Sequence, residues 1–219
     1  MNPQGILITF EGLDGCGKST QLAREAERLR KLGREVVVTS EPGGTVIGRQ
    51  IREIVLNSAS GPLAPATELA LMFAARAQHL SQVIGPAIKA GQIVLCDRFT
   101  DSTIAYQGYG RGIPLGDIDD LNRIICNNAC PDLTLFLDID PELAAARTVS
   151  RNRAAFQKNT RFEEEGLEFF RRVRQGYYEI AKSDPGRVHI VDGRGAETDV
   201  ARRVTLSVDD FLRVRTGAS

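Results

Sequence analysis

One octapeptide restricts the folds open to this chain more than any other feature of its sequence. Residues 12–19 read Gly-Leu-Asp-Gly-Cys-Gly-Lys-Ser and fit the pattern G-x-x-x-x-G-K-[ST] without a mismatch. The glycines let successive backbone N–H groups point at phosphate oxygens, and a helix that begins after the loop adds its positive dipole end. Because such a loop lies between a strand and a helix, the pattern predicts a strand–loop–helix unit near the N-terminus.

The segments on either side of this loop have the required patterns, and the alternation continues along the chain. Residues 5–10 form a short apolar run of β-formers, and residues 18–32 carry apolar side chains at helical spacing before Gly33. Four more strands are expected at 35–39, 92–96, 133–138 and 188–191. Further helices are expected at 47–56, 65–90, 100–107, 117–129, 141–150, 163–182 and 197–214. Strands separated by helices predict an α/β fold, with a five-stranded parallel sheet and helices on both of its faces.

The composition fits one folded domain over residues 1–219 and argues against several other classes of protein. An apolar content of 42% is too high for a disordered chain. Twenty-eight basic side chains balance twenty-eight acidic ones, which argues against a protein that coats nucleic acid. No apolar run reaches the length of a membrane span, and no basic leader precedes the first one. We therefore expect a soluble cytoplasmic protein with neither a nucleic-acid nor a membrane partner.

The four cysteines are too few for a disulfide scaffold. Cys126 and Cys130 could share a helix face and hold a metal ion, but His79 and His189 are isolated and no second cysteine pair lies near. Buried, reduced thiols are the favoured interpretation.

Polar residues that follow two of the strands are the candidates for chemistry, because ligands of a parallel sheet gather at the carboxyl ends of its strands. After the first strand, Lys18 can reach the β- and γ-phosphates, and the Ser19 hydroxyl can bind Mg²⁺. After the third strand, Asp97 can hold Mg²⁺ or accept a hydroxyl proton, and Arg98 can bind a second anion. A purely structural Asp97–Arg98 pair is the alternative.

The long helix predicted at 65–90 carries a second candidate pair. Phe73 and Arg76 are three residues apart and therefore neighbours on the helix surface, although most such Phe residues belong to a core. Gly85-Pro86 should disturb this helix near its end.

Residues 147–161 are rich in Arg and poor in large apolar side chains, so we expect this segment to pack weakly and to move. Arg147 and Arg151 are four residues apart and would share a helix face, with Arg153 next along. A solvated basic face is the alternative to a catalytic one.

Five motifs in order resemble those of thymidylate kinases, and the resemblance runs from about residue 5 to residue 212. The motifs are residues 12–19, Glu41-Pro42-Gly43-Gly44-Thr45, Phe73-Ala74-Ala75-Arg76, Asp97-Arg98 and residues 106–112, Tyr-Gln-Gly-Tyr-Gly-Arg-Gly. The resemblance implies phosphoryl transfer from ATP to dTMP with Mg²⁺, on the route to dTTP, in a homodimer. It also implies the fold of P-loop nucleoside monophosphate kinases, with a mobile lid at about 147–161.

On the donor side, the resemblance implies that the loop holds the phosphates of ATP and that Ser19 and Asp97 hold Mg²⁺. The residues that would contact ATP are Gly12, Leu13, Asp14, Gly15, Cys16, Gly17, Lys18, Ser19 and Thr20. Some members carry a catalytic Arg at the position of Gly15. This chain resembles the bacterial pattern, in which a closing lid supplies that Arg, and a positioned Arg can be worth roughly 10³–10⁵ in rate.

On the acceptor side, the resemblance implies that Phe73 stacks on thymine and that Arg76 hydrogen-bonds a base carbonyl. Asp14 would face the sugar 3′-hydroxyl, and Arg98 would bind the acceptor phosphate. The remaining residues on this side would be Pro42, Ser102, Tyr106 beneath the deoxyribose and Gln107 at the base.

The chain departs from the family pattern at two positions. Ser40 stands where many members have Arg, which removes an anion contact. Thr160 stands where Asp is usual, and Glu163 or Glu164 is the candidate to replace that carboxylate.

Two other functions are compatible with parts of this pattern. One is a kinase for another nucleotide such as dUMP, since one methyl group separates thymine from uracil. The other is a nucleotide-dependent switch, although the chain has no Asn-Lys-x-Asp guanine motif. By resemblance, the dimer surface would be the apolar face of the long helix, although the same residues fit a core: Leu69, Met72, Leu80 and Val83.

Overall fold

A five-stranded sheet forms the centre of the computed structural model, which describes residues 5–57, 61–155, 161–162 and 164–216. The strands are β1 (Ile6–Glu11), β2 (Val36–Ser40), β3 (Ile93–Asp97), β4 (Leu133–Asp138) and β5 (Val188–Asp192). They are all parallel and lie in the order β2-β3-β1-β4-β5. The predicted α/β fold with a five-stranded parallel sheet is confirmed.

The register of the strands brings three loops to one edge of the sheet. Phe10 of β1 and Ser40 of β2 both pair with Asp97 of β3. The chain segments that leave β1, β2 and β3 therefore start side by side, which is the arrangement that a ligand site at the carboxyl edge requires.

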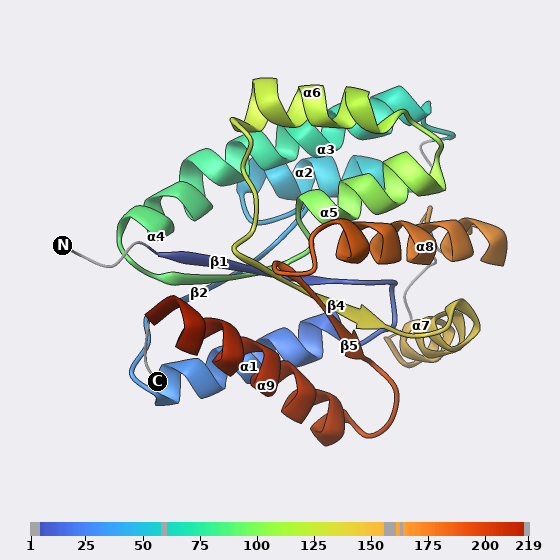
Figure 1. Ribbon diagram of the computed structural model, residues 1–219. Helices are drawn as coiled ribbons and strands as arrows, with labels where there is room; N and C mark the ends of the chain where they lie inside the picture. Colours follow the sequence, from blue (N-terminus) through green and yellow to red (C-terminus); the bar gives the residue numbers. More distant parts are fainter. Residues whose placement is uncertain (1–4, 58–60, 156–160, 163, 217–219) are drawn as a thin grey trace.

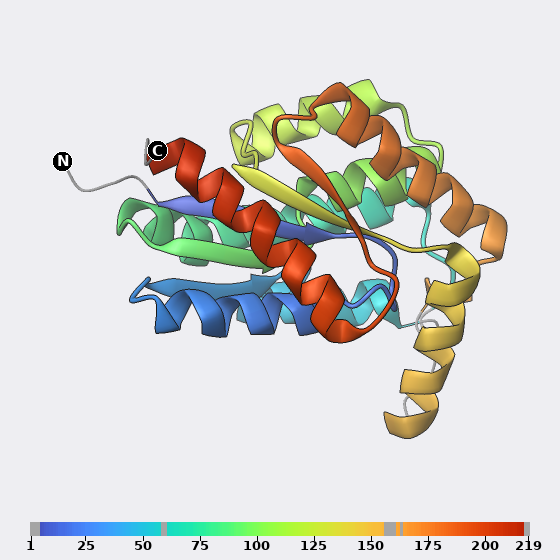
Figure 2. The same ribbon diagram turned by 60° about the horizontal axis from the view of Figure 1, so that its bottom comes forward.

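Helices cover both faces of the sheet (Figure 1). α1 (Lys18–Lys31) and α9 (Glu197–Thr216) pack together on one face. The other face carries α2 (Val46–Leu56), α3 (Pro65–His79), α4 (Gly85–Lys89), α5 (Thr100–Thr103), α6 (Leu115–Cys126) and α8 (Leu167–Ser183). α7 (Pro141–Ala155) stands out beyond the carboxyl end of β4 (Figure 2). Within the described residues, no helix is both long and apolar enough to cross a membrane.

The long helix predicted at 65–90 is helical throughout, but its turn widens before Pro86. Residues Leu80–Ile84 form a π-helical turn between α3 and α4, and the Gly85 N–H bonds to the Leu80 carbonyl five residues back. Proline has no N–H and its ring crowds the carbonyl one turn earlier, so the wider turn accommodates it without breaking the helix.

The helix predicted at 100–107 is present, as α5 over Thr100–Thr103 followed by a second π-helical segment, Ile104–Gly110. Tyr106 and Gln107 lie in this wide turn, and both side chains are buried. Such turns occur often at functional sites.

Arg161, the last residue of the Arg-rich segment 147–161, is buried. The Arg161 guanidinium donates to the carbonyls of Val55 (3.1 Å) and Asn57 (2.7 Å). Phe162 is buried and meets the Tyr106 ring edge-on at 5.5 Å between centroids. Residues 156–160, including Thr160, and Glu163 lie outside the described part of the chain.

Candidate active site

The carboxyl edge of the sheet opens into a cavity of about 960 Å³. Its walls come from the loop after β1, the loop after β2, α2, α3, the segment after β3, and α7. The predicted site residues on these walls are Asp14, Gly15, Gly17, Lys18, Ser19, Thr20, Pro42, Asp97, Arg98, Ser102, Tyr106 and Arg147. The other predicted site residues whose side chains the structure describes do not line this cavity: Gly12, Leu13, Cys16, Phe73, Arg76 and Gln107.

The loop after β1 depends on glycine at positions where the backbone is left-handed. Gly15 and Gly17 have φ of 85° and 100°, and α1 begins directly after Gly17. A Cβ on Gly15 would lie 2.4 Å from the Ala144 carbonyl oxygen of α7. α7 therefore leaves no room for a side chain at position 15, so a catalytic Arg cannot come from there in this arrangement.

Lys18 folds back onto its own loop. Its buried ammonium donates to the carbonyls of Gly12 (3.1 Å) and Leu13 (2.9 Å) and lies 3.9 Å from Asp14 Oδ1. These weak neutral acceptors are the partners that a phosphate oxygen would replace. Cys16 lies beside this amine with its thiol buried, and burial raises the pKa of that thiol.

Ser19 and Asp97 come together as the sequence predicts for a metal site. The Ser19 hydroxyl donates to Asp97 Oδ2 at 2.6 Å, so two oxygen ligands for a hard cation stand side by side at the cavity. Mg²⁺ takes one or two protein oxygens and completes its shell with phosphate and water, so this pair fits Mg²⁺. Within the described residues, no group of three or more His, Cys, Asp or Glu side chains could hold a metal ion.

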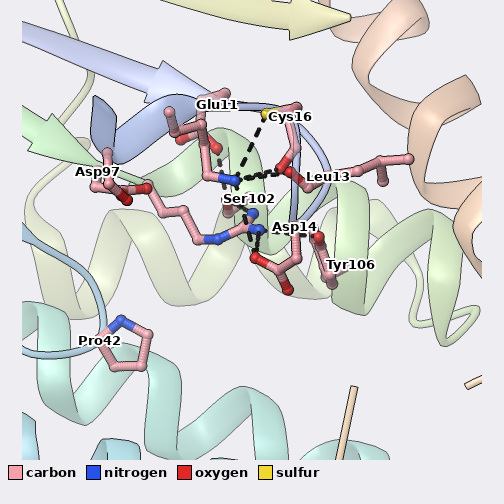
Figure 3. A network of polar contacts seen from close by, with 12 residues as sticks. Glu11, Leu13, Asp14, Cys16, Pro42, Asp97, Ser102 and Tyr106 are labelled. Atoms are coloured by element: carbon pink, nitrogen blue, oxygen red, sulfur yellow. Dashed lines mark hydrogen bonds and ion pairs between the residues drawn. The ribbon is translucent and has the colours of Figure 1, made fainter. Parts of the chain in front are cut away.

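Arg98 donates hydrogen bonds to four side chains, of which Figure 3 labels Asp14, Ser102 and Tyr106. Its Nη2 donates to Asp14 Oδ1 (2.8 Å) and Tyr106 Oη (3.0 Å), and its Nη1 donates to Ser102 Oγ (3.0 Å) and Tyr177 Oη (3.3 Å). The guanidinium carbon lies 4.7 Å from the Tyr106 ring centroid. Its backbone is left-handed, with φ of 71°, which is a strained conformation for a side chain of this size and is typical of functional sites.

Glu11, the last residue of β1, hydrogen-bonds two of the side chains that hold Arg98, and the sequence did not single it out. Its fully buried carboxylate accepts the Phe99 N–H (2.7 Å) and the hydroxyls of Ser102 (2.5 Å) and Tyr177 (2.9 Å). Burial, and then the negative charge of Asp101, raise its pKa to about 7. The signal in the sequence is a carboxylate at the end of an otherwise apolar strand.

Arg52 of α2 is a second cavity residue that the sequence analysis missed. Its Nη1 donates to the Pro42 carbonyl at 3.1 Å, and both residues line the cavity. Desolvation by the surrounding protein and the positive charge of Arg98 both lower the pKa of Arg52. Two cations that repel each other across a cavity are suited to an anion between them. Arg52 lies in an ordinary helix rich in charges, which gives no signal in the sequence.

Phe73, the predicted base-stacking residue, does not line the cavity. Its side chain is fully buried and belongs to a core cluster with Leu69, Ile118 and Cys126 between α3 and α6. Its neighbour Met72 lines the cavity instead. Leu69 is also core, so the suggested dimer surface does not extend over that residue.

Arg76 and Gln107 are buried and each leaves one polar atom without a partner among the described residues. Arg76 donates to Glu41 (2.8 Å) and to Thr103 (2.8 Å), while its Nη1 has no partner there. Gln107 donates from Nε2 to Glu68 (2.8 Å), and its Oε1 has no hydrogen-bond partner among the described residues. A buried donor and a buried acceptor that lack protein partners are available to a polar ligand or to water.

The Arg-rich helix α7 brings Arg147 to the cavity wall, where its Nη1 donates to the Gly193 carbonyl at 3.3 Å. Arg151 and Arg153 follow on the same helix, but their side chains are outside the described part of the structure. Of the two departures from the family pattern, Ser40 lines the cavity, and Thr160 lies outside the described residues. Glu164, a candidate to replace the missing carboxylate, is exposed.

The cysteines are free, as predicted, but one of them is not buried. Cys16, Cys96 and Cys126 are buried, whereas Cys130 is exposed. The turn after α6, in which Asn127 and Asn128 adopt left-handed conformations, ends the helix before Cys130 and separates it from Cys126.

The comparisons with known proteins agree with one another. The family model for thymidylate kinase matches residues 10–204. The thymidylate kinase of Syntrophotalea carbinolica is 45% identical over 97% of this chain and 99% of its own length. That of Pelobacter propionicus is 46% identical over 93% and 94% of the two chains. The crystal structure of thymidylate kinase from Ehrlichia chaffeensis superposes with a TM-score of 0.76 at 34% identity, covering 94% of this chain and all of that one.

A phosphate-binding loop, a serine–aspartate pair and an arginine-lined cavity thus occur in a chain that resembles these proteins over nearly its whole length. This chain belongs to the thymidylate kinase family.

Proposed function

We propose that this chain transfers the γ-phosphoryl group of ATP to dTMP, with Mg²⁺ as the metal and the cavity residues in the roles given below. As a member of the thymidylate kinase family it is a kinase that forms dTDP from dTMP. The observation that carries the proposal is a single cavity with a phosphate-binding loop on one wall and the Arg52–Arg98 pair on the others.

On the donor side, the N–H groups of the loop and the N-terminus of α1 would bind the β- and γ-phosphates. Lys18 would exchange its two carbonyl partners for phosphate oxygens. Ser19 and Asp97 would hold Mg²⁺, whose positive charge would offset the negative charge on the transferring group.

On the acceptor side, Arg98 and Arg52 would bind the 5′-phosphate of dTMP. One of its oxygens attacks the γ-phosphorus while the bond from that phosphorus to the bridging β-γ oxygen breaks, so that dTDP and ADP form. A phosphate oxygen is already anionic and needs no general base, so catalysis rests on holding the two nucleotides in line and on neutralising charge. Asp14, which accepts from Arg98, would orient that guanidinium and would face the sugar.

The base would be read by two of the buried atoms that lack hydrogen-bond partners among the described residues. Arg76 Nη1 is a donor that suits a thymine carbonyl, and Gln107 Oε1 is an acceptor that suits the N3–H of thymine. Glu68 requires the NH₂ end of Gln107, which fixes the orientation of the amide. Cytosine presents the opposite donor and acceptor pattern at these positions, so it would be rejected.

Arg147 is the lid arginine with a described position at the cavity, and we propose that α7 supplies cationic stabilisation to the transferring group from there. A homodimer and a cytoplasmic location remain predictions. Sedimentation of the purified chain tests the first of them.

The experiment that tests the proposal follows ADP release from ATP and Mg²⁺ with dTMP, with dUMP and with no acceptor. ADP should form rapidly only with dTMP, and chelation of Mg²⁺ should stop the reaction. ADP release at the same rate without an acceptor would reject the kinase mechanism. A larger kcat/KM for dUMP would reassign the acceptor.

A further inference from the structure

His79, the last residue of α3, is a buried histidine to which the mechanism above gives no role. Its side chain is 2% exposed and does not line the cavity. Its Nδ1 lies 2.9 Å from Glu41 Oε1, and its Nε2 lies 2.6 Å from Thr39 Oγ1. Both ring nitrogens are therefore hydrogen-bonded, one to β2 and the other to the residue that follows β2.

The chemistry of Glu41 decides which ring nitrogen carries the proton. A carboxylate only accepts hydrogen bonds, so Nδ1 of His79 donates to it. In the neutral ring, Nε2 then accepts from the Thr39 hydroxyl. The loop after β2 lies against the ring, since a Cβ on Gly44 would be 2.3 Å from Nε2. His79 is therefore held in one orientation and one tautomer.

The second oxygen of Glu41 holds Arg76. Glu41 Oε2 accepts from Arg76 Nε at 2.8 Å, while Arg76 Nη2 donates to the Phe99 carbonyl (3.1 Å) and to Thr103 Oγ1 (2.8 Å). The third guanidinium nitrogen, Nη1, is the one without a partner among the described residues. Glu41 thus gives one oxygen to each neighbour, so the direction of its carboxylate, and with it that of the guanidinium, depends on His79.

We propose that His79 is a positioning residue, which holds Glu41 so that Arg76 presents Nη1 to the base of the acceptor nucleotide. This inference rests on the proposed function, because it concerns how the same site reads the base. Without the Nδ1–H donor, one buried oxygen of Glu41 would lose its partner. The carboxylate would then turn to bind Arg76 through both oxygens, and Nη1 would leave its position at the base.

The sequence offers a direct probe of this contact, because the chain has two histidines, His79 and His189. Protein with ¹⁵N-labelled histidine rings should give two sets of ring signals, and His79→Asn identifies the set from His79. Nδ1 of His79 should carry a proton with and without dTMP, and its signal should shift when dTMP binds. An Nδ1 that carries no proton would overturn the proposal.

Variants separate positioning from packing. His79→Leu fills a similar volume without a donor and should raise KM for dTMP about 10-fold, with little change in kcat or in KM for ATP. The inhibition constant of 2-deoxyribose 5-phosphate should stay near its wild-type value, because that ligand has no base for Arg76 to contact. His79→Asn keeps an N–H donor near the place of Nδ1 and should restore most of the affinity for dTMP. His189→Asn, on β5, does not touch the cavity and is the matched control.

A double-mutant cycle tests whether His79 acts through Arg76. In an Arg76→Met background, His79→Leu should raise KM for dTMP by less than about twofold, since the donor that it positions is gone. Equal effects of His79→Leu in the two backgrounds would overturn the positioning role, and so would an unchanged KM for dTMP or no recovery in His79→Asn.

These outcomes are distinct from a failure of the proposed function. If His79→Leu does not fold, the proton on Nδ1 of the wild-type protein and the KM of His79→Asn still decide the role of His79. If the wild-type protein phosphorylates dTMP while the tests on His79 fail, the kinase function stands without this role. If the wild-type protein neither binds nor phosphorylates dTMP, the proposed function itself fails.

Discussion

The two ends of the cavity are built from different parts of the polypeptide. At the phosphate-loop end, the groups that would meet the ligand are mostly backbone N–H groups, placed by glycine conformations and by the start of α1. At the base end, they are side chains from separate elements, such as Arg76 of α3 and Gln107 of the π-helical segment, each fixed by a buried carboxylate.

This difference decides how each end responds to change. The backbone end tolerates side-chain variation except where a Cβ collides or a charge is lost. The side-chain end is a network of buried polar groups, in which removal of one partner leaves another unsatisfied. Substitutions at the two ends should therefore fail in different ways, and the following predictions test this.

The largest effect is expected at Lys18. Lys18→Ala removes the cation that would bind the β- and γ-phosphates, and kcat should fall by about 10³-fold or more, roughly 4 kcal/mol of barrier. Stopped assays at saturating ATP and dTMP measure it. The exposed Lys182→Ala is the matched control and should retain wild-type kcat. Activity within tenfold of wild type in Lys18→Ala would remove this residue from the mechanism.

Gly15→Ala tests the backbone of the same end. At φ of 85°, and with a Cβ only 2.4 Å from the Ala144 carbonyl, alanine should strain the loop or push α7 away. We expect a loss of about 2–3 kcal/mol in unfolding free energy. Urea unfolding measures it, with Gly116→Ala as control, since a Cβ there meets nothing within 4 Å. Equal stability of the two variants would show that α7 does not press on the loop.

Arg52→Ala tests the acceptor side. Loss of one of two guanidiniums that would bind the same phosphate should raise KM for dTMP about 30-fold, roughly 2 kcal/mol, while KM for ATP changes little. Arg49→Ala lies one turn earlier on the same helix with an exposed side chain and serves as control. A rise in KM for ATP instead would place Arg52 on the donor side.

The two ends of the cavity also differ in how far the sequence predicts them. Asp97 was placed opposite Ser19 because parallel strands end at one edge of a sheet, and the two side chains do hydrogen-bond. The five-stranded parallel sheet followed from the alternation of strand and helix patterns. Both inferences depend on local periodicity and on one general rule of topology.

The base end depends on quantities that local patterns do not contain. Whether Met72 or Phe73 faces the cavity is set by how α3 rotates against α6, and a helical pattern shows both residues as apolar. The π-helical segment Ile104–Gly110 changes which side chains point inward, and the sequence predicts a helix in this region but not its wider turn. Arg52 lines the cavity because α2 packs beside it, and this packing is not encoded in the local sequence pattern.

The smallest expected effect concerns the buried carboxyl of Glu11. Its pKa is raised from 4.5 to about 7 in the folded protein, so the folded state binds more protons than the unfolded state between these values. This group therefore stabilises the fold most fully below pH 4.5, and its contribution is lost as the pH rises through 7. Between pH 6 and pH 8 it should lower the unfolding free energy by about 1 kcal/mol.

Glu11→Gln removes this titration while keeping a similar shape, so the fall in stability between pH 6 and pH 8 should become shallower than in the wild type. Urea unfolding at closely spaced pH values measures the two slopes, and the exposed Glu53→Gln should keep the wild-type slope. Because Ser102 and Tyr177 connect Glu11 to Arg98, the variant should also raise KM for dTMP more than KM for ATP. An identical pH dependence of the unfolding free energy in wild type and Glu11→Gln would mean that the carboxyl is already ionised at pH 6. The hydroxyls of Ser102 and Tyr177 would then donate to a carboxylate that stays ionised throughout this range.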